Sequence, residues 1–138
     1  MGPSLTPARS FPHFNSLIYQ ASTPAVVNAA VNATYTPAQV LTGMIFRDPQ
    51  GGVKTDTLPT ARDLAQGLPG VAVGTTLSLL VRNEGGATVT IAVGAGGTAS
   101  GSPLTVLVAN NRVFRIRFTN VTPGSEAYTL YTFGTVAF

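Results

Sequence analysis

Arg112-Val-Phe-Arg-Ile-Arg-Phe118 is the stretch that decides the fold, because apolar and arginine side chains alternate along it. Successive side chains of a β-strand point to opposite faces. A strand here places Val113, Arg115 and Arg117 on one face and an apolar set on the other. The pattern therefore predicts a core strand with a basic outer face. The expected core side chains are Phe114, Ile116 and Phe118.

A second strand-forming run, Ala127–Phe138, follows a loop whose Thr122-Pro-Gly-Ser125 has turn chemistry. β-Branched and aromatic residues occupy this run to its last residue. Such an apolar terminus would fray and expose its side chains if it were unpaired. We expect it to be held in the sheet or against another subunit.

The composition is unusually poor in charge. Only 9% of the 138 residues are charged, against about 25% in a typical soluble domain. A surface with so little charge favours a protein that is packed into an assembly over a free monomer. The length corresponds to one domain.

Several functional classes are disfavoured by the same composition. Eight basic and five acidic residues give a formal charge of +3, but the arginines are scattered and Lys54 is the single lysine, so no specific nucleic-acid surface is expected. The absence of cysteine excludes disulfides and zinc-thiolate sites. No apolar run approaches the roughly 20 residues that span a bilayer, so no membrane association is expected. Without the pattern of a signal peptide, the protein is expected to act where it is made.

The first 35 residues differ from the rest. They show no sustained helical or strand period, and four prolines exclude a long helix or a central strand. We expect residues 1–35 to form an extended arm that lies along another surface, with a poorly ordered leader as the alternative. Residues 36–138 would form a β-rich domain. The expected apolar anchors of the arm are Phe11, Phe14, Leu17, Ile18 and Tyr19.

Two short helices are predicted inside the domain. Thr36-Pro-Ala-Gln39 is a capping box with proline at the first helical position, and its helix should end near Leu41. Thr60-Ala-Arg-Asp63 repeats this chemistry, and its helix should end near Gln66, before the stop signal of Gly67.

The remaining segments predict strands and turns. A short strand at Met44–Arg47 leads into the turn Asp48–Gly52, and Val53–Leu58 is expected to be an exposed hairpin arm or loop. Leu77–Arg82 and Thr88–Val93 are expected to pair as a hairpin.

A second hairpin is predicted from Leu104–Ala109 and Arg112–Phe118, which flank the turn-forming Asn110-Asn111. Gly94–Gly101 is expected to be a flexible connection. With the terminal run this makes six or seven strands. The predicted fold class is all-β: an antiparallel β-sandwich or jelly-roll-like barrel with one or two short helices and an extended N-terminal arm.

Several of these strands are apolar on both faces, as the consecutive apolar residues at 79–81 and 106–108 show. A sheet that is apolar on both faces must be packed against other protein on both sides. A domain of this size has little material for the second layer, so another subunit is the simplest source. We therefore predict a homo-oligomer. The expected interface residues are Leu80, Leu107, Tyr131 and Phe133.

No candidate for catalysis, cofactor or metal binding is convincing. His13 is the only histidine, and no second histidine or cysteine completes a triad or metal site. Asp48 and Asp56 bracket a glycine-rich turn, but without the spacing of a calcium loop. We expect no enzyme. Arg115 and Arg117 are possible partner contacts, with pairing to Glu84 and Glu126 of the same chain or a solvated face as alternatives.

Three stretches, Thr36–Gly52, Thr55–Ala61 and Phe118–Tyr131, resemble a family of small tailed-phage virion proteins: the capsid cement or decoration proteins and related head-fibre proteins of phages that include those of cyanobacteria. The resemblance covers residues 36–138 and not the arm. It implies an all-β domain that clamps neighbouring major capsid proteins from outside, commonly as a trimer. It brings no catalytic residues.

The resulting expectation is a structural virion protein that assembles in the host cytoplasm and lies on the outer capsid surface. Its partners would be the major capsid protein and, in a homotrimer, itself. The alternative is a receptor- or glycan-binding β module of a head fibre or tail, for which Tyr128, Tyr131 and Asn110-Asn111 are the candidate residues.

Overall fold

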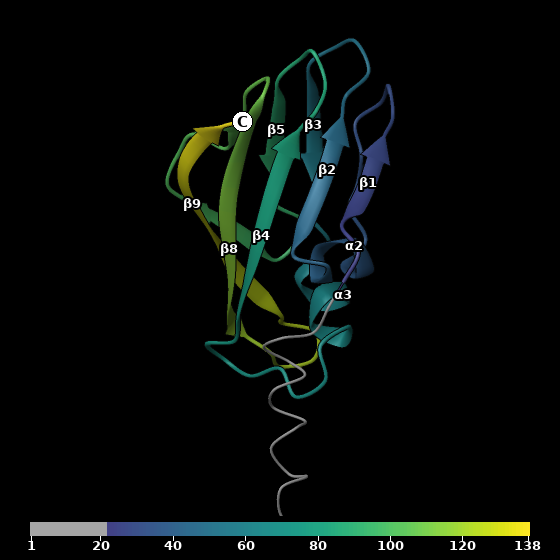
Figure 1. The fold of residues 1–138 in the computed structure, drawn as a ribbon. Helices are drawn as coiled ribbons and strands as arrows, with labels where there is room; N and C mark the ends of the chain where they lie inside the picture. Colours follow the sequence, from purple (N-terminus) through teal and green to yellow (C-terminus); the bar gives the residue numbers. More distant parts are fainter. Residues whose placement is uncertain (1–21) are drawn as a thin grey trace, which may run out of the picture.

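The structure, a computed structural model, describes residues 22–138. The expected arm anchors Phe11, Phe14, Leu17, Ile18 and Tyr19, and also His13, lie outside these residues. Figure 1 shows the arrangement of the elements. In chain order they are β1 (Ala25–Asn28), α2 (Pro37–Leu41), β2 (Met44–Asp48), β3 (Lys54–Thr57), α3 (Ala61–Gln66), β4 (Thr76–Asn83), β5 (Val89–Ala92), β6 (Gly97–Ser100), β7 (Thr105–Val106), β8 (Asn110–Asn120) and β9 (Ala127–Ala137).

The described chain is mostly β-strand, and the predicted all-β class is confirmed. It forms a six-stranded sheet in the order β1-β2-β4-β8-β9-β6 and a three-stranded sheet in the order β3-β5-β7. The small sheet lies behind the large one in Figure 1. The expectation of purely antiparallel pairing is wrong, because β1–β2, β2–β4, β3–β5 and β6–β9 are parallel.

The parallel pairs arise because the chain alternates between the two sheets. It passes from β2 in the large sheet to β3 in the small sheet, returns through α3 to β4, and crosses again to β5. The chain thus passes through both sheets twice, and the second passage stacks on the first. Ile45 pairs with Val81 in the large sheet, and Thr55 pairs with Thr90 in the small one. The predicted hairpin between Leu77–Arg82 and Thr88–Val93 is therefore wrong.

A buried asparagine shows why the loop after β4 changes sheet instead of closing a hairpin. The side-chain amide of Asn83 donates to the carbonyl of Ala87 at 2.7 Å and to that of Val106, in the small sheet, at 3.0 Å. Its Oδ1 accepts from the Gly85 N–H at 3.0 Å. These bonds hold the loop across the end of the core.

The second predicted hairpin is also wrong. β7 pairs with β5 and not with β8. Asn110 and Asn111 are the first residues of β8, and the turn falls earlier, where Ala109 has a φ of 57° and the Asn110 N–H donates to the Leu107 carbonyl at 3.1 Å. Ala109 thus takes the left-handed conformation that we expected of the asparagines.

Two segments, one expected to be an exposed hairpin arm or loop and the other a flexible connection, are strands of the two sheets. Val53–Leu58 contains β3, and Asp56 and Leu58 are buried rather than exposed. Gly94–Gly101 contains β6, which pairs in parallel with the start of β9. Glycine is required at position 97, because a Cβ there would lie 2.6 Å from the Tyr128 ring.

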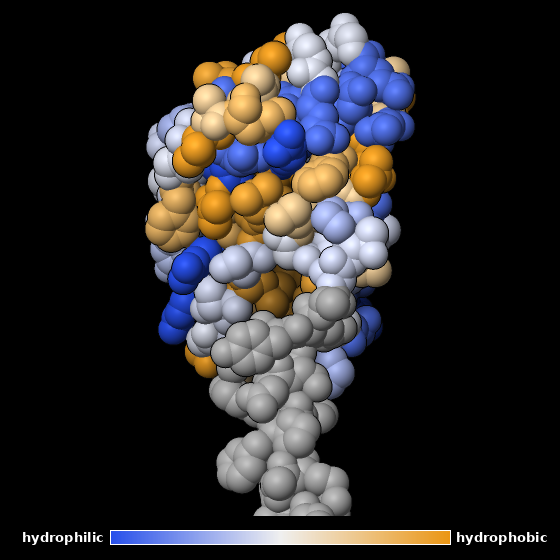
Figure 2. Space-filling model, viewed as in Figure 1, coloured by the Kyte–Doolittle hydropathy of each residue, from blue (hydrophilic) through white to orange (hydrophobic). Residues whose placement is uncertain are grey.

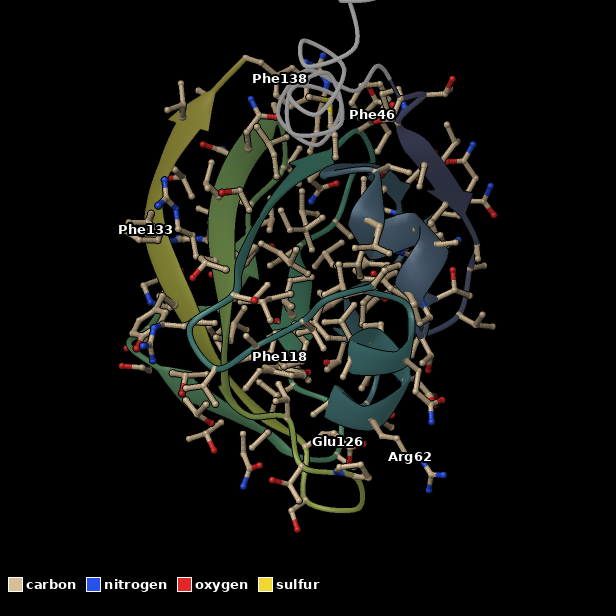
Figure 3. The ribbon with its side chains drawn as sticks, turned by 90° about the horizontal axis from the view of Figure 1, so that it is seen from below. Phe46, Arg62, Phe118, Glu126, Phe133 and Phe138 are labelled. Carbon is tan, nitrogen blue, oxygen red and sulfur yellow. The ribbon has the colours of Figure 1, made fainter. Side chains whose placement is uncertain are left out.

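The core lies between the sheets, and its centre is the predicted apolar face of β8. Phe114, Ile116 and Phe118 are fully buried, whereas Arg115 and Arg117 are exposed, so the alternation is confirmed. Figure 3 shows Phe118 inside the molecule, where its ring meets that of Tyr128 edge-on at 6.4 Å. The small sheet and the helices supply the opposing apolar side chains, which include Val40, Leu64, Val89, Ile91 and Val106.

Both predicted helices are present with their caps. In the capping box of α2, the Gln39 N–H donates to Thr36 Oγ1 at 3.1 Å and the Thr36 N–H donates to Gln39 Oε1 at 2.9 Å. At α3 the Asp63 N–H donates to Thr60 Oγ1 at 3.1 Å. No helix among residues 22–138 is long and apolar enough to cross a membrane.

The β domain begins before the expected boundary at residue 36. β1 pairs in parallel with β2, and Tyr35 is a buried member of the core. Residues 25–35 are therefore part of the fold, and the portion of the proposed arm outside the described residues is 1–21.

Candidate partner-binding face

One side of the six-stranded sheet turns away from the core, and we call it the outer face. Paired residues on neighbouring strands share a face. The register aligns Val26 with Phe46, Met44 with Leu80, and Arg115 with Tyr131, and these residues are all at least partly exposed. The outer face comprises Val26, Met44, Phe46, Leu80, Arg82, Val113, Arg115, Arg117, Tyr131 and Phe133.

Aromatic rings and arginines alternate on this face. The Arg82 guanidinium lies over the Phe138 ring at 3.6 Å and near the Phe46 ring at 5.8 Å. The Arg115 guanidinium lies 5.7 Å from the Phe133 ring. Figure 2 shows hydrophobic side chains across the middle of the face, between groups of hydrophilic ones. A mixture of aromatic rings and arginine is typical of the residues that contribute most to protein–protein binding.

The arginines of the outer face differ in whether an acidic side chain pairs with them. Arg82 Nε lies 3.0 Å from Glu84 Oε2 in an exposed ion pair. Within residues 22–138, Arg115 and Arg117 form no ion pair. The alternative of intrachain pairing for these two arginines is therefore not seen, since Glu84 binds Arg82 and Glu126 Oε1 accepts from the Gly124 N–H at 2.9 Å. The face thus carries two positive charges that no acidic side chain of the described chain neutralises.

The sequence assigned two different contacts to residues that the structure brings together. Leu80, Tyr131 and Phe133, expected at an oligomer interface, lie on the same face as Arg115 and Arg117, expected to meet another protein. Leu107, the fourth expected interface residue, lies apart from them in the turn before β8 and is exposed.

The residues expected for glycan binding are separated. Tyr128 is buried, where its hydroxyl donates to the Pro59 carbonyl at 3.0 Å and accepts from the Gly94 N–H at 2.9 Å. Burial raises the pKa of Tyr128, and the bond from Gly94 partly opposes this. Tyr131 is exposed, and Asn110-Asn111 is part of a strand rather than a turn. These four residues therefore do not form a shared surface on which a sugar could stack.

A buried polar cluster is the feature that sequence reasoning missed. Arg47 and Asp56 are both 0% exposed. Arg47 Nε donates to Asp56 Oδ2 at 2.6 Å, and its Nη2 donates to Oδ1 at 3.1 Å. The Tyr35 hydroxyl donates to Asp56 Oδ2 at 2.6 Å. Asp56 was considered for calcium binding on sequence grounds. Both oxygens of its carboxylate instead accept hydrogen bonds from side chains of the protein.

This cluster attaches the N-terminal edge of the domain to the core. The remaining donors of Arg47 reach the carbonyls of Ala29 at 2.9 Å and Val31 at 2.8 Å. Burial raises the pKa of Tyr35 well above its usual value, and the Asp56 charge raises it further. Burial alone would lower the pKa of Arg47, but the hydrogen bonds and charge of Asp56 outweigh it and the pKa is raised. The signal was available, because Arg47 takes the inward position after Ile45 in the alternation of β2.

No hollow in the described part of the chain gathers catalytic groups. A groove of about 610 Å³ beside Leu41, Leu68 and Leu77 has no titratable side chain. A shallower hollow of about 360 Å³ contains Arg62 and Glu126, which Figure 3 shows at the same end of the molecule. Among residues 22–138 no three His, Cys, Asp or Glu side chains could hold a metal ion.

Comparisons of the chain with protein-family models, with curated protein sequences and with solved structures give no match. The candidate site is therefore defined by its geometry. It is a rigid sheet face with exposed aromatic rings and two arginines that have no ion-pair partner among residues 22–138. Such a face is suited to contact with another macromolecule.

Proposed function

We propose that this protein is a structural virion protein: a capsid cement (decoration) protein that binds the outer surface of the major capsid protein shell and stabilises it, as a homotrimer. The observation that carries the proposal is the outer face, where aromatic rings and the unneutralised Arg115 and Arg117 lie together on one sheet. The resemblance of Thr36–Gly52, Thr55–Ala61 and Phe118–Tyr131 to phage decoration proteins supports the same function.

We extend the proposal to the detailed fold of the domain. We assign the domain to the β-sandwiches rather than to the jelly-roll-like barrels. Its core lies between two separate sheets, and its four parallel strand pairs do not fit the antiparallel Greek keys of a jelly roll. A packed sandwich is rigid, so it can hold the outer face in a fixed orientation against a shell.

The mechanism is the addition of lateral contacts to the shell. Three copies joined in one body engage three sites at once, so modest contacts multiply into firm attachment. Arg115 and Arg117 would meet acidic capsid surface, and the N-terminal arm would insert its apolar side chains between subunits. The arm anchors in this proposal are Phe11, Phe14, Leu17, Ile18 and Tyr19, which lie outside the described residues.

Binding to shells that lack the protein tests the role of the outer face. Purified protein is sedimented with expanded shells of the major capsid protein from the same virus. We expect the double substitution Arg115→Glu and Arg117→Glu to weaken binding by about tenfold or more, since tenfold corresponds to only about 1.4 kcal/mol.

Arg62→Glu is the matched control for the change of charge. Arg62 is also exposed, but it lies on α3 and not on the outer face. This variant should bind shells like the wild type. Equal binding by the double variant and the Arg62→Glu control would contradict the assignment of the outer face.

The arm is tested by a separate double substitution, Phe11→Ala and Phe14→Ala. We expect lower shell occupancy with an unchanged oligomer mass, because the arm contacts the shell rather than the other copies. If occupancy does not change, the arm is not a capsid contact.

The alternative function, a receptor- or glycan-binding β module of a head fibre or tail, rests on Tyr131 alone among its candidate aromatics, since Tyr128 is buried. Binding of the isolated protein to a glycan array would favour this function over capsid attachment.

A further inference from the structure

The outer face cannot easily serve both of the contacts that the proposed function requires. A homotrimer and a capsid contact would compete for Tyr131 and Phe133 if both used it. The charges of Arg115 and Arg117 argue against using this face for contact between copies. Burial between copies would remove two charges per copy from water without an ion-pair partner, which is costly.

The acidic groups around the face do not remove this cost. Glu126 lies three residues before Thr129, the partner of Arg117, but within the described chain it forms no ion pair and it accepts from the Gly124 N–H. Asp48 and Glu84 lie at the other end of the sheet, near Arg82, which pairs with Asn111. Arg115 follows Asn111 by about 13 Å along β8. Both carboxylates already accept hydrogen bonds, from the Gln50 N–H and from Arg82. The outer face is therefore better suited to an acidic partner than to a second copy of this chain.

A different surface, at the end of β9, has the opposite character. β6 pairs with β9 only from Tyr128 to Tyr131, so the rest of β9 has β8 on one side and an open edge on the other. Residues 133–138 are exposed at every position, whereas a sheet strand normally buries every second side chain. Figure 1 places this end of the chain away from α2 and α3.

The turn before β8 extends this surface. The Phe138 N–H donates to the Ala109 carbonyl at 3.0 Å. Val108, Ala109 and Phe138 line one side of a hollow whose other side is formed by residues 83–85, which include Glu84. We call the exposed apolar residues here the C-terminal patch, and Figure 2 shows hydrophobic side chains gathered at this end. The patch comprises Leu107, Val108, Val136 and Phe138.

The C-terminal patch lacks the features that keep sheet edges apart. Native edge strands are usually protected by charge or proline. The run Ala127–Phe138 contains neither. Two charges border this edge: Arg82 lies over the Phe138 ring, and Glu84 lines the same hollow as Phe138. They pair with each other, so the edge carries no net charge and can meet an identical copy without repulsion.

We propose that the C-terminal patch is the contact between copies of this chain, and that the outer face stays free for the acidic partner. Copies pack Val136, Phe138 and the Leu107–Val108 turn about a common axis. The inference rests on the homotrimer of the proposed function, and it replaces Leu80, Tyr131 and Phe133 as the self-association surface. Of the interface residues expected from sequence, it retains Leu107.

The test is the mass of the full chain in solution, measured by light scattering over a range of concentrations. The wild type should be oligomeric, and Val136→Lys should reduce it to a monomer. Val26→Lys is the matched control, because Val26 is 61% exposed and Val136 is 67% exposed. Val26 lies on the edge strand β1, and Val136 lies on the part of β9 that β6 leaves unpaired. The control should keep the wild-type mass.

A second variant separates lost contact from lost folding. Val108→Lys changes the patch outside any strand, so it leaves every β pairing intact. It should also give a monomer, with the melting temperature of a folded domain. An oligomer in both Val136→Lys and Val108→Lys, or a wild type that is monomeric at about 100 μM, would overturn the proposal.

The result is independent of shell binding. A wild type that forms oligomers through the C-terminal patch but does not bind shells would leave this inference standing and remove the proposed function. Conversely, Arg115→Glu with Arg117→Glu should lose shell binding while keeping the oligomer mass.

Discussion

At the residue scale, the pair of Arg47 and Asp56 is the most consequential polar contact in the domain. It is fully buried, and removing one partner leaves the other as an uncompensated charge. We predict that Arg47→Met lowers the free energy of unfolding by about 3–5 kcal/mol. Equilibrium unfolding in urea measures the loss.

The second ion pair of the described chain provides the control for this prediction. Arg82 and Glu84 lie at a similar distance but are exposed to solvent. Glu84→Gln should therefore change the free energy of unfolding by less than about 1 kcal/mol. A loss no greater for Arg47→Met than for Glu84→Gln would show that the buried pair is not structurally important.

Tyr35 gives a prediction for alkaline pH. Its pKa is raised in the folded protein by burial and by Asp56, so the unfolded chain ionises first, above about pH 10. The stabilising effect of the neutral hydroxyl is fully present below this pH and is lost as the pH rises. We expect the stability advantage of the wild type over Tyr35→Phe to shrink by about 1.4 kcal/mol per pH unit above pH 10.

Unfolding curves of the two proteins at several pH values between about 9 and 11 test this prediction. A constant difference between wild type and Tyr35→Phe across this range would mean that the Tyr35 hydroxyl ionises as readily in the folded protein as in the unfolded chain.

At the element scale, the winding of the chain between the two sheets depends on Gly94, where two backbone segments lie close together. A Cβ there would lie 2.5 Å from the carbonyl oxygens of Leu58 and Pro59, which are backbone atoms and cannot rotate away. We predict that Gly94→Ala lowers the free energy of unfolding by about 2 kcal/mol. Thermal or urea unfolding measures this.

Gly86 is the matched glycine, because it lies in the exposed loop after β4 and a Cβ there would meet no atom within 4 Å. Gly86→Ala should stay within about 0.5 kcal/mol of the wild type. Equal effects of the two substitutions would contradict the tight contact between the loop before β6 and the segment that enters α3.

Local structure was predictable from the sequence, and strand pairing was not. Helix caps depend on a few neighbouring residues, so Thr36 and Thr60 were identified correctly. The alternation of β8 likewise identified its buried face. Both predicted hairpins are wrong because a short loop does not require the strands beside it to pair, and Asn83 holds its loop across two sheets.

The two strands that stack in parallel resemble each other in sequence. Ile45-Phe-Arg-Asp48 is followed by Gly51-Gly52, and Val81-Arg-Asn83 is followed by Gly85-Gly86. In the structure these segments are the parallel strands β2 and β4 with their loops. This likeness does not by itself specify the pairing, which depends on contacts such as those of Asn83 between the two sheets.

At the scale of the whole molecule, the distribution of charge separates two surfaces. The outer face carries Arg115 and Arg117, which have no acidic partner within residues 22–138. The C-terminal patch has no charged side chain of its own, and the two charges that border it, Arg82 and Glu84, pair with each other. The sequence identified most of these residues, but it could not separate the surfaces, because the register of β4, β8 and β9 decides which side chains lie together.

Salt should therefore act differently on the two contacts. Screening weakens attraction between exposed charges, so shell binding through the arginines should fall as ionic strength rises from about 0.05 to 0.5 M. The oligomer mass should not fall over this range, since apolar contact does not depend on charge attraction. Sedimentation with shells and light scattering in the same buffers measure the two effects, and an oligomer that dissociates with salt would contradict the uncharged contact.

Shell stabilisation is tested most directly by the temperature at which expanded shells that lack this protein break open, measured with and without added wild-type protein. If the protein is a capsid cement protein, its binding to the outer surface of the shells should be saturable. The temperature at which the shells break open should then rise with occupancy until the sites are full. Shells that bind no protein, or that break at the same temperature when saturated with it, would contradict the proposed function.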